Sequence, residues 1–546
     1  MKAFVGIILG LIGLLMAGAL GMQGLTLRKT ALEPRLLVSD SKDEMLYEAG
    51  MLSAAMIAPP REQMVAQAAP VLTSPRKTDA SAEAPAAPPV PAAEAAAPKP
   101  IKAAPKAEPA RAKNVVYFIV DGMGPTQVTA ARIYKGGSTG QLAMESFPYT
   151  GYLRTWSSSD YVTDSAAAGT ALAAGIKTYN GAIGVSDAKL DPAGVSRDVE
   201  SLADVAAREG KAIGIITTSK VTDATPSAFY AHVKSRGEET EIASQATTSS
   251  LTVLMGGGRM FFRPTSWIDP ETSATGKRED GTDMVEKMVG DGWTYVESLE
   301  EFNAVDPQTP GLRLLGLFDD YTMLYEMDRA NDVLGEPSLA QMVAKALRIL
   351  EQDPDGYFLM VESGRVDHAG HANDARRLCE DMLAMDKAVE TALAETTDQT
   401  LIVVTADHET GGMAINGYHA REGLYGDRLL MMIDDGTTTL GLVTWGSGPG
   451  GHPPLEGPGS LDYPHASAQF GGAAAHNAVD VPVVAIGPGA ERFTGYMQNS
   501  DIPQKIAAAM GLAFNAQANQ ENRKAMEALI KAGVDKRTGV ELEKAN

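Results

Sequence analysis

Short runs of apolar residues, rich in β-branched and aromatic side chains, recur along the chain and are typical of buried strands. Stretches with helical periodicity lie between several of these runs, for example at residues 202–208 and 339–350. The alternation predicts βα units, and therefore an α/β fold whose large, mostly parallel central sheet carries helices on both faces. The expected strands lie at residues 115–120, 212–217, 251–255, 357–361, 401–404 and 481–486.

Three of these runs lead into an acidic residue. They are followed by Asp121, by Glu362 and, after two intervening residues, by Asp407. In open α/β sheets, ligands bind outside the carboxyl ends of the strands. Three acidic groups at one sheet edge would repel one another unless cations lay between them. The pattern therefore predicts a metal cluster at this edge.

The two ends of the chain differ in composition from this core. Residues 3–22 are apolar throughout, and about twenty such residues span a bilayer. Residues 68–111 are rich in Ala and Pro, a composition that buries too little apolar surface to fold. The expected divisions are a signal peptide or N-terminal membrane anchor at 1–27, a disordered linker at 28–112, a folded domain at 113–515 with an insertion at 417–475, and a helical tail at 516–546.

Charge and cysteine content exclude some classes of protein. The net charge of −22 argues against nucleic acid as a partner, because binding to a phosphate backbone requires a basic face. The single cysteine, Cys379, excludes an intrachain disulfide. The apolar N-terminal run predicts export to the periplasm or the extracellular space. The only expected membrane contact is through that segment, which would either tether the protein to the inner membrane or be cleaved.

Two polar segments carry candidate chemistry. Asp164 and Ser165 precede an Ala-rich stretch, so Ser165 is expected at a helix N-terminus, where backbone N–H groups favour negative charge. An N-capping pair explains the same two residues without a catalytic role. Asp367 and His371 lie four residues apart, so one helical turn places both on one face, as metal chelation requires. A solvated polar turn is the alternative.

Six motifs together resemble the alkaline phosphatases. They read VDGMG, TDSAAAGTA, VTDATPSAFYAHVKSR, VESGRVDHAGH, TADHETGG and AAAHNAVDVPV, and they follow the order of the family over about residues 113–500. The resemblance implies an enzyme that hydrolyses small phosphate monoesters through a phosphoserine, at a site with two Zn²⁺ ions and one Mg²⁺ ion. It makes residues 113–515 the catalytic domain and leaves a homodimer open.

The resemblance also implies a role for individual residues. Ser165 would be the nucleophile, preceded by Asp164, and Arg236 would bind the phosphate group of the substrate. His368 would lie beside the magnesium site. Imidazole and carboxylate ligands suit zinc, whereas an all-oxygen set suits magnesium. The implied ligands are Asp367, His371 and His476 for one zinc, Asp121, Asp407 and His408 for the other, and Asp121, Thr225 and Glu362 for magnesium, with Asp223 close by.

Two departures from the family pattern bear on the chemistry. Position 368 is His, where some members carry Lys or Trp, so metal preference and pH optimum stay open. His476 is followed by Asn477 rather than the more usual Thr or Ala, a change expected to be minor. The variable segment before His476 leaves substrate access open as well.

The sequence gives less support to a sulfatase, a phosphodiesterase or an inactive relative than to a phosphomonoesterase. Sulfatases of this superfamily need a Cys/Ser-x-Pro-x-Arg motif, but Ser165 is followed by three alanines. Phosphodiesterases of the superfamily usually use threonine and must accept a second ester group, whereas Arg236 favours a terminal phosphate. A catalytically inactive phosphate- or metal-binding relative would be expected to lose the nucleophile or a ligand. The sequence retains the full set, which favours the monoesterase.

Overall fold

The computed structural model describes the central part of the chain and some later segments. Residues 1–110 lie outside the described residues, and so do the expected signal or anchor and nearly all of the expected linker. No helix among the described residues is both long and apolar enough to cross a membrane. The described ranges are 111–191, 193–270, 272–332, 334–416, 432–434, 439–441, 443–449, 467–514, 521–522, 524–526, 528, 534–535 and 540–541.

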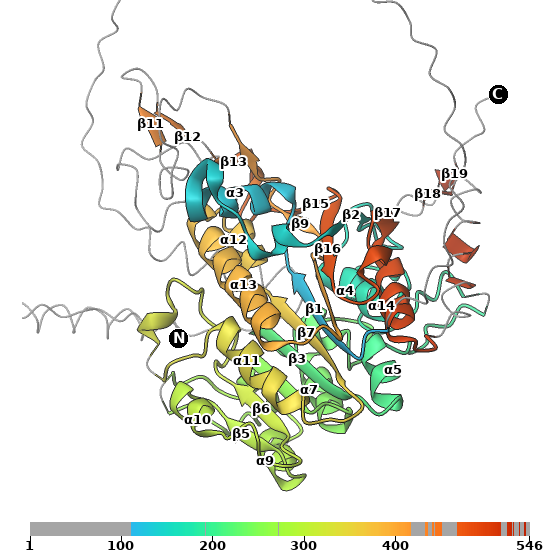
Figure 1. The fold of residues 1–546 in the computed structure, drawn as a ribbon, viewed down its shortest axis with the longest axis vertical. Coiled ribbons are helices and arrows are strands. Elements are labelled where there is room, and N and C mark those ends of the chain that lie inside the picture. The colour runs from blue at the N-terminus through green and yellow to red at the C-terminus, as the bar shows by residue number, and fades with distance from the viewer. Residues whose placement is uncertain are drawn as a thin grey trace, which may run out of the picture. The chain divides into compact units, whose positions relative to one another are not determined.

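A ten-stranded sheet forms the centre of the described part (Figure 1). Neighbouring strands run parallel except around β16, which is antiparallel to both β2 and β8. The six expected strands all belong to this sheet, so the predicted fold class is confirmed. In spatial order the strands are β17 (Gly495–Gln498), β2 (Tyr149–Arg154), β16 (Val481–Ile486), β8 (Thr400–Thr405), β1 (Asn114–Val120), β7 (Tyr357–Ser363), β3 (Ala212–Lys220), β4 (Val253–Gly257), β6 (Leu314–Leu317) and β5 (Thr294–Val296).

The central strands are buried along their whole length. All seven residues of β1 and all seven of β7 are buried, which requires cover on both faces of the sheet. Two groups of mutually packed helices provide this cover. One group is α3 (Pro125–Gly136), α11 (Leu339–Leu350), α12 (Arg365–His371) and α13 (Ala375–Glu395), and the other includes α4 (Ser165–Ala174), α5 (Leu202–Arg208), α6 (Ala224–Ser227) and α14 (Ile502–Met510). Four further helices are α7 (Glu239–Thr248), α8 (Arg259–Phe262), α9 (Met284–Gly290) and α10 (Leu299–Ala304).

Helix α4 shows why the Ala-rich stretch folds as it does. The Asp164 carboxylate accepts a hydrogen bond from the backbone N–H of Ala167, which caps the helix at its N-terminus. Gly175 ends the helix in a left-handed conformation, with φ of 74°. All ten helical residues are buried, because small side chains let neighbouring elements pack closely around them. Ser165 is therefore the first residue of a buried, rigid helix, as expected.

Part of the expected insertion at 417–475 is described, and it forms short strands. β13 (Val443–Gly448) pairs antiparallel with β10 (Ala414–Ile415) and parallel with β14 (Ser467–Phe470). β11 (Met432–Asp434) pairs with β12 (Thr439–Gly441). In the tail at 516–546, which was expected to be helical, the described residues also include an antiparallel pair, β18 (Val534–Asp535) with β19 (Val540–Glu541). Each of these two strands begins with a β-branched valine, which favours extended backbone.

Candidate active site

The ends of three neighbouring strands bring the three predicted acidic residues to one edge of the sheet. β1 lies between β7 and β8, and Ile119 of β1 stands opposite Glu362 of β7 and Thr405 of β8. Asp121 follows β1 directly, and Asp407 follows β8 after one residue. Asp121, Glu362 and Asp407 are all buried. The structure thus places them together, as the pattern of strands predicted.

Ser165 faces the first cluster of ligand atoms. Its Oγ lies 3.0 Å from His408 Nε2. The same nitrogen lies 3.1 Å from Asp407 Oδ2 and 3.5 Å from Asp121 Oδ1. One potential ligand atom from each of Asp121, Asp407 and His408 lies within 4.8 Å of the others. This is the set that the resemblance to the alkaline phosphatases implied for one zinc ion, and the Ser165 hydroxyl lies beside it.

The second cluster lies where helix α12 meets β15 (His476–Asn477), which pairs with β9 (Glu409–Thr410). His371 Nε2 is 3.1 Å from Asp367 Oδ2 and 3.1 Å from His476 Nε2. His476 Nε2 is 3.6 Å from Asp367 Oδ1. Ligand atoms of Asp367, His476 and His408 also lie within 4.8 Å of one another, and the rings of His408 and His476 stack with centroids 3.6 Å apart. The two clusters are therefore adjacent.

Hydrogen bonds at Nδ1 orient the two imidazoles of the second cluster. Nδ1 of His371 lies 2.6 Å from the carbonyl oxygen of Ala474, and Nδ1 of His476 lies 3.0 Å from that of Thr163. A carbonyl oxygen only accepts, so each Nδ1 carries the proton and each neutral ring presents a lone pair at Nε2. These two lone pairs face each other at 3.1 Å. Such an arrangement is repulsive unless a cation binds between them.

Thr410 orients the third imidazole in the same way. Its hydroxyl donates a hydrogen bond to Asp367 Oδ1, so its oxygen accepts from His408 Nδ1 at 3.3 Å. His408 Nε2 then also presents a lone pair, directed at Ser165 and the carboxylates of Asp121 and Asp407. Each of the three imidazoles thus has a backbone carbonyl or a hydroxyl at Nδ1, so that Nε2 can offer a lone pair to a metal ion.

Several oxygens at this edge would gain from a bound cation. Asp121 Oδ1, Asp407 Oδ2 and Thr225 Oγ1 are buried and have no hydrogen-bond partner among the described residues. Buried polar atoms are rarely left in this state, because it costs free energy. Thr225 lies on α6, which packs against α4, and is a predicted magnesium ligand with Glu362. The donor set therefore fits metal ions.

The carboxyl groups repel one another strongly in this protein. Burial raises the pKa of Asp121 and of Glu362 well above the usual values, and the charges of neighbouring carboxylates raise both further. Burial and the negative charge of Asp367 raise the pKa of Asp407 to about 7. Three such groups at one place hold their charges only at a cost, which bound cations would offset.

Asp367 and the imidazoles behave in the opposite way. Burial alone would raise the pKa of Asp367, but His371, His476 and His408 lower it well below its usual range. Burial and the proximity of His476 lower the pKa of His408 far below its usual value. Burial likewise lowers the pKa of His476. A lowered pKa favours the neutral ring in His408 and His476 and the ionised carboxylate in Asp367, which are the states that bind a metal ion.

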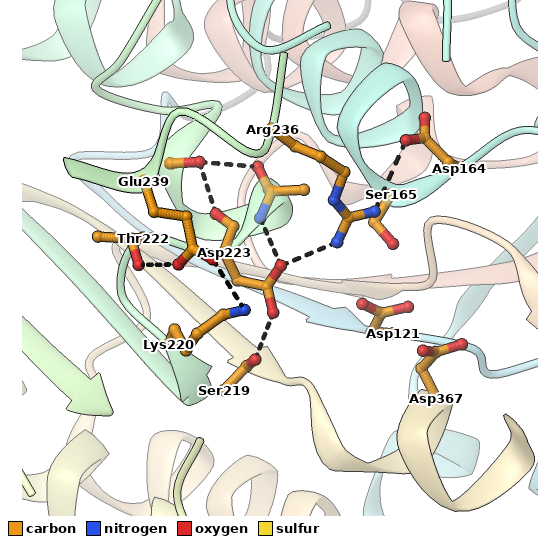
Figure 2. A network of polar contacts seen from close by, with 12 residues as sticks. Asp121, Asp164, Ser165, Ser219, Lys220, Thr222, Asp223, Arg236, Glu239 and Asp367 are labelled. Atoms are coloured by element: carbon orange, nitrogen blue, oxygen red, sulfur yellow. Dashed lines mark hydrogen bonds and ion pairs between the residues drawn. The ribbon is translucent and has the colours of Figure 1, made fainter. Parts of the chain in front are cut away.

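Arg236 lies beside Ser165 rather than at the surface (Figure 2). Its side chain is 18% exposed. Nη2 is 2.9 Å from Asp223 Oδ1, and Nη1 is 3.6 Å from Asp164 Oδ2. Asp223 in turn accepts hydrogen bonds from Ser219 Oγ at 2.5 Å and from a backbone N–H. The guanidinium is thus held by two carboxylates next to the proposed nucleophile.

Comparisons with known proteins agree with this geometry. A model of the alkaline phosphatase family matches residues 112–512. The chain belongs to the alkaline phosphatase family. It is 35% identical to the tissue-nonspecific alkaline phosphatase isozyme of Gallus gallus over 455 residues, 74% of this chain and 85% of that protein. The membrane-bound alkaline phosphatase of Bombyx mori is 31% identical over 460 residues, 74% of this chain and 82% of that protein.

A solved alkaline phosphatase from the Antarctic bacterium TAB5 has a similar structure. The TM-score is 0.56 at 29% identity, covering 74% of this chain and 100% of that one. A variant of the TAB5 enzyme was solved with magnesium bound in its M3 site. Family membership makes this protein a phosphatase, and the convergent imidazoles and carboxylates support its dependence on metal ions.

The phosphatase also contains site residues that sequence reasoning missed. Thr410 stands two positions after His408, a spacing that could have suggested a partner for it. His368 Nδ1 lies 2.7 Å from a nitrogen of Arg365, which therefore donates to it. Lys220 lies beside Asp223, and its charge lowers the pKa of that carboxyl group against the opposing effect of burial. The contacts of Thr410 and of Arg365 depend on how their side chains are oriented. The proximity of Lys220 to Asp223 depends on a turn of the backbone.

Proposed function

We propose that this phosphatase hydrolyses phosphate monoesters through a covalent phosphoserine at Ser165. The observation that carries the proposal is the position of Ser165 Oγ, 3.0 Å from an unprotonated His408 nitrogen and at the start of α4. Negative charge that develops on a phosphoryl group there would be favoured by the helix N-terminus. The guanidinium of Arg236, which Asp223 and Asp164 hold in place, lies on the same side of the site and would donate to the phosphoryl oxygens.

The donor sets suit two zinc ions and one magnesium ion. Asp367, His371 and His476 would hold one zinc, and Asp121, Asp407 and His408 would hold the other. Asp121, Thr225 and Glu362 offer only oxygen atoms, which suits magnesium, and Asp223 lies nearby. When bound, such ions lower the pKa of coordinated oxygens and stabilise negative charge on the reacting group.

The residues of the chain have separate roles in the two steps of the reaction. Arg236 holds two oxygens of the phosphoryl group, a planar bidentate contact that Lys does not provide. Ser165 Oγ forms the new bond to phosphorus as the ester bond breaks, and the proton that the serine hydroxyl loses leaves with the alcohol. Water then attacks the phosphoserine, which releases inorganic phosphate and regenerates the serine hydroxyl. Asp164 and Asp223 keep the guanidinium in place in both steps.

Ser165→Ala tests the proposal directly. The variant is expected to lose most turnover of a phosphomonoester, with some residual activity, and labelled phosphate trapped by acid quenching should be absent from it. Ser201→Ala is a matched control, because Ser201 is the N-cap of α5 and its hydroxyl bonds to Asp204 and Phe229, neither of which is a candidate ligand. Metal analysis and a panel of monoester, diester and sulfate ester substrates complete the test. Undiminished turnover, or label on another residue, would contradict it.

Export of the catalytic domain is a second part of the proposal. We propose a signal or anchor at 1–27, a linker at 28–112, a catalytic domain at 113–515 and a tail at 516–546. One relative is named as membrane-bound, and every candidate site residue follows residue 112. Removal of residues 1–111 is expected to yield a soluble, fully active enzyme. Fractionation of the full-length protein separates a membrane tether from a cleaved signal, and activity confined to the cytosol would contradict both.

A further inference from the structure

Lys220 is a buried lysine that the proposed chemistry does not use. It ends β3 and is 1% exposed. Its Nζ lies 3.3 Å from Glu239 Oε1 and 4.2 Å from the centre of the Tyr321 ring, with Phe261 at 5.9 Å. Burying an ammonium group is costly unless it is paired, and the carboxylate and the aromatic faces offset that cost. The buried ammonium group of Lys220 is therefore expected to have a specific role.

The lysine joins the two segments that build the phosphate side of the site. Residues 220–225 carry Asp223 and Thr225, and residues 235–239 carry Arg236 and end with Glu239. Both oxygens of Glu239 are held by the first segment. Oε1 faces Lys220 Nζ, and Oε2 accepts a hydrogen bond from Thr222 Oγ1 at 2.7 Å. Arg236 is three residues before Glu239, so these contacts fix the turn from which its side chain extends.

The charge of Lys220 also acts on Asp223. Figure 2 shows Lys220, Thr222 and Glu239 on the far side of Asp223 from Ser165. Asp223 therefore lies between two cations, Lys220 and Arg236. Without the positive charge of Lys220, the Asp223 carboxylate would attract the guanidinium more strongly. Binding of phosphate to Arg236 would then be weaker, because the guanidinium would have to give up a stronger interaction with Asp223.

We propose that Lys220 is a positioning residue for phosphate binding. Together with Glu239 it holds the segment that carries Arg236. Its positive charge also partly balances the negative charge of Asp223, so that the Arg236 guanidinium can bind a phosphoryl group. The inference rests on the proposed function only in that Arg236 contacts phosphate.

Lys220→Met tests the charge at nearly constant side-chain length. The inhibition constant of inorganic phosphate and the KM of a phosphomonoester are expected to rise about tenfold, with kcat and zinc content changing far less. Lys220→Arg should restore both constants to within about threefold of the wild type, because the charge is retained. Glu239→Gln, which keeps the shape of the side chain, should raise both constants in the same direction.

A matched control separates positioning from stability. Lys345 also lies over an aromatic ring, with Nζ 4.3 Å from the centre of Phe302, and donates to the backbone carbonyls of Phe302 and Val305, in a segment that holds none of the candidate site residues. Lys345→Met should lower the melting temperature without changing the phosphate constants. Calorimetric titration of phosphate into the wild type tests the proposed site itself. If wild-type phosphate binding is present but Lys220→Met and Glu239→Gln bind phosphate within twofold of it, Lys220 is only structural. If Lys220→Met does not fold, Glu239→Gln and Lys220→Arg decide the question.

Discussion

Thr410→Val removes a single hydroxyl that links the two clusters of metal ligands. Thr410 is fully buried, and its hydroxyl donates to Asp367 Oδ1 and accepts from His408 Nδ1. Valine has nearly the same shape, so the packing is retained while both partners lose their hydrogen bond. A hydrogen-bonded partner behind a metal ligand is typically worth roughly ten- to a hundredfold in metal affinity.

The magnitude can be compared with the cost of the lost hydrogen bonds. Each buried group left without a partner costs about 1–3 kcal/mol, and a tenfold change in affinity corresponds to about 1.4 kcal/mol. We therefore expect the zinc dissociation constants to rise about tenfold or more. Competition with a chromophoric chelator measures them directly, in the metal-free protein and without reference to catalysis. Thr410→Ser, which keeps the hydroxyl, should bind zinc nearly as tightly as the wild type.

Thr170→Val is the matched control for this experiment. Thr170 is equally buried, and its hydroxyl donates to Ala182 O at 3.1 Å and accepts from Gly184 N at 2.9 Å. The substitution therefore removes the same number of hydrogen bonds, and neither partner is a candidate metal ligand. It should lower the melting temperature and leave zinc affinity unchanged. Zinc dissociation constants of Thr410→Val within twofold of the wild type would refute the argument that this hydroxyl orients the ligands.

Two further predictions follow from the site. Arg236→Ala should raise KM and weaken phosphate inhibition with little change in zinc content, because a charge-assisted bidentate contact is worth about 1.5–3 kcal/mol, or roughly ten- to a hundredfold in kcat/KM. Unchanged steady-state constants would show that Arg236 does not contact phosphate. Zinc affinity should fall by up to about tenfold per pH unit below neutrality. The pKa of Asp407 in the metal-free protein is raised to about 7, so below that pH a proton competes with zinc for this carboxylate. Affinity that stays constant from pH 7 to pH 5.5 would contradict that account.

Local patterns were sufficient for the strands that surround the site. Parallel strands covered on both faces need continuous apolar runs, so β1, β7 and β8 could be read directly from composition. The same reasoning missed β2, whose burial alternates along YTGYLR, and β6, which has only four residues. It also left open the direction of β16, because an apolar run is the same whether a strand is parallel or antiparallel to its neighbours.

The sequence by itself determined the types of ligand and their places at strand ends and on a helical turn. Only the tertiary structure decided how they face one another. His371 and His476 are 105 residues apart in the chain, and their Nε2 atoms meet at 3.1 Å because β15 pairs with β9 beside α12. Arg236 lies in a run of charged residues typical of a solvent-exposed turn, yet ion pairs with Asp164 and Asp223 place it in the site. Contacts between side chains far apart in the chain depend on packing, which local composition does not encode.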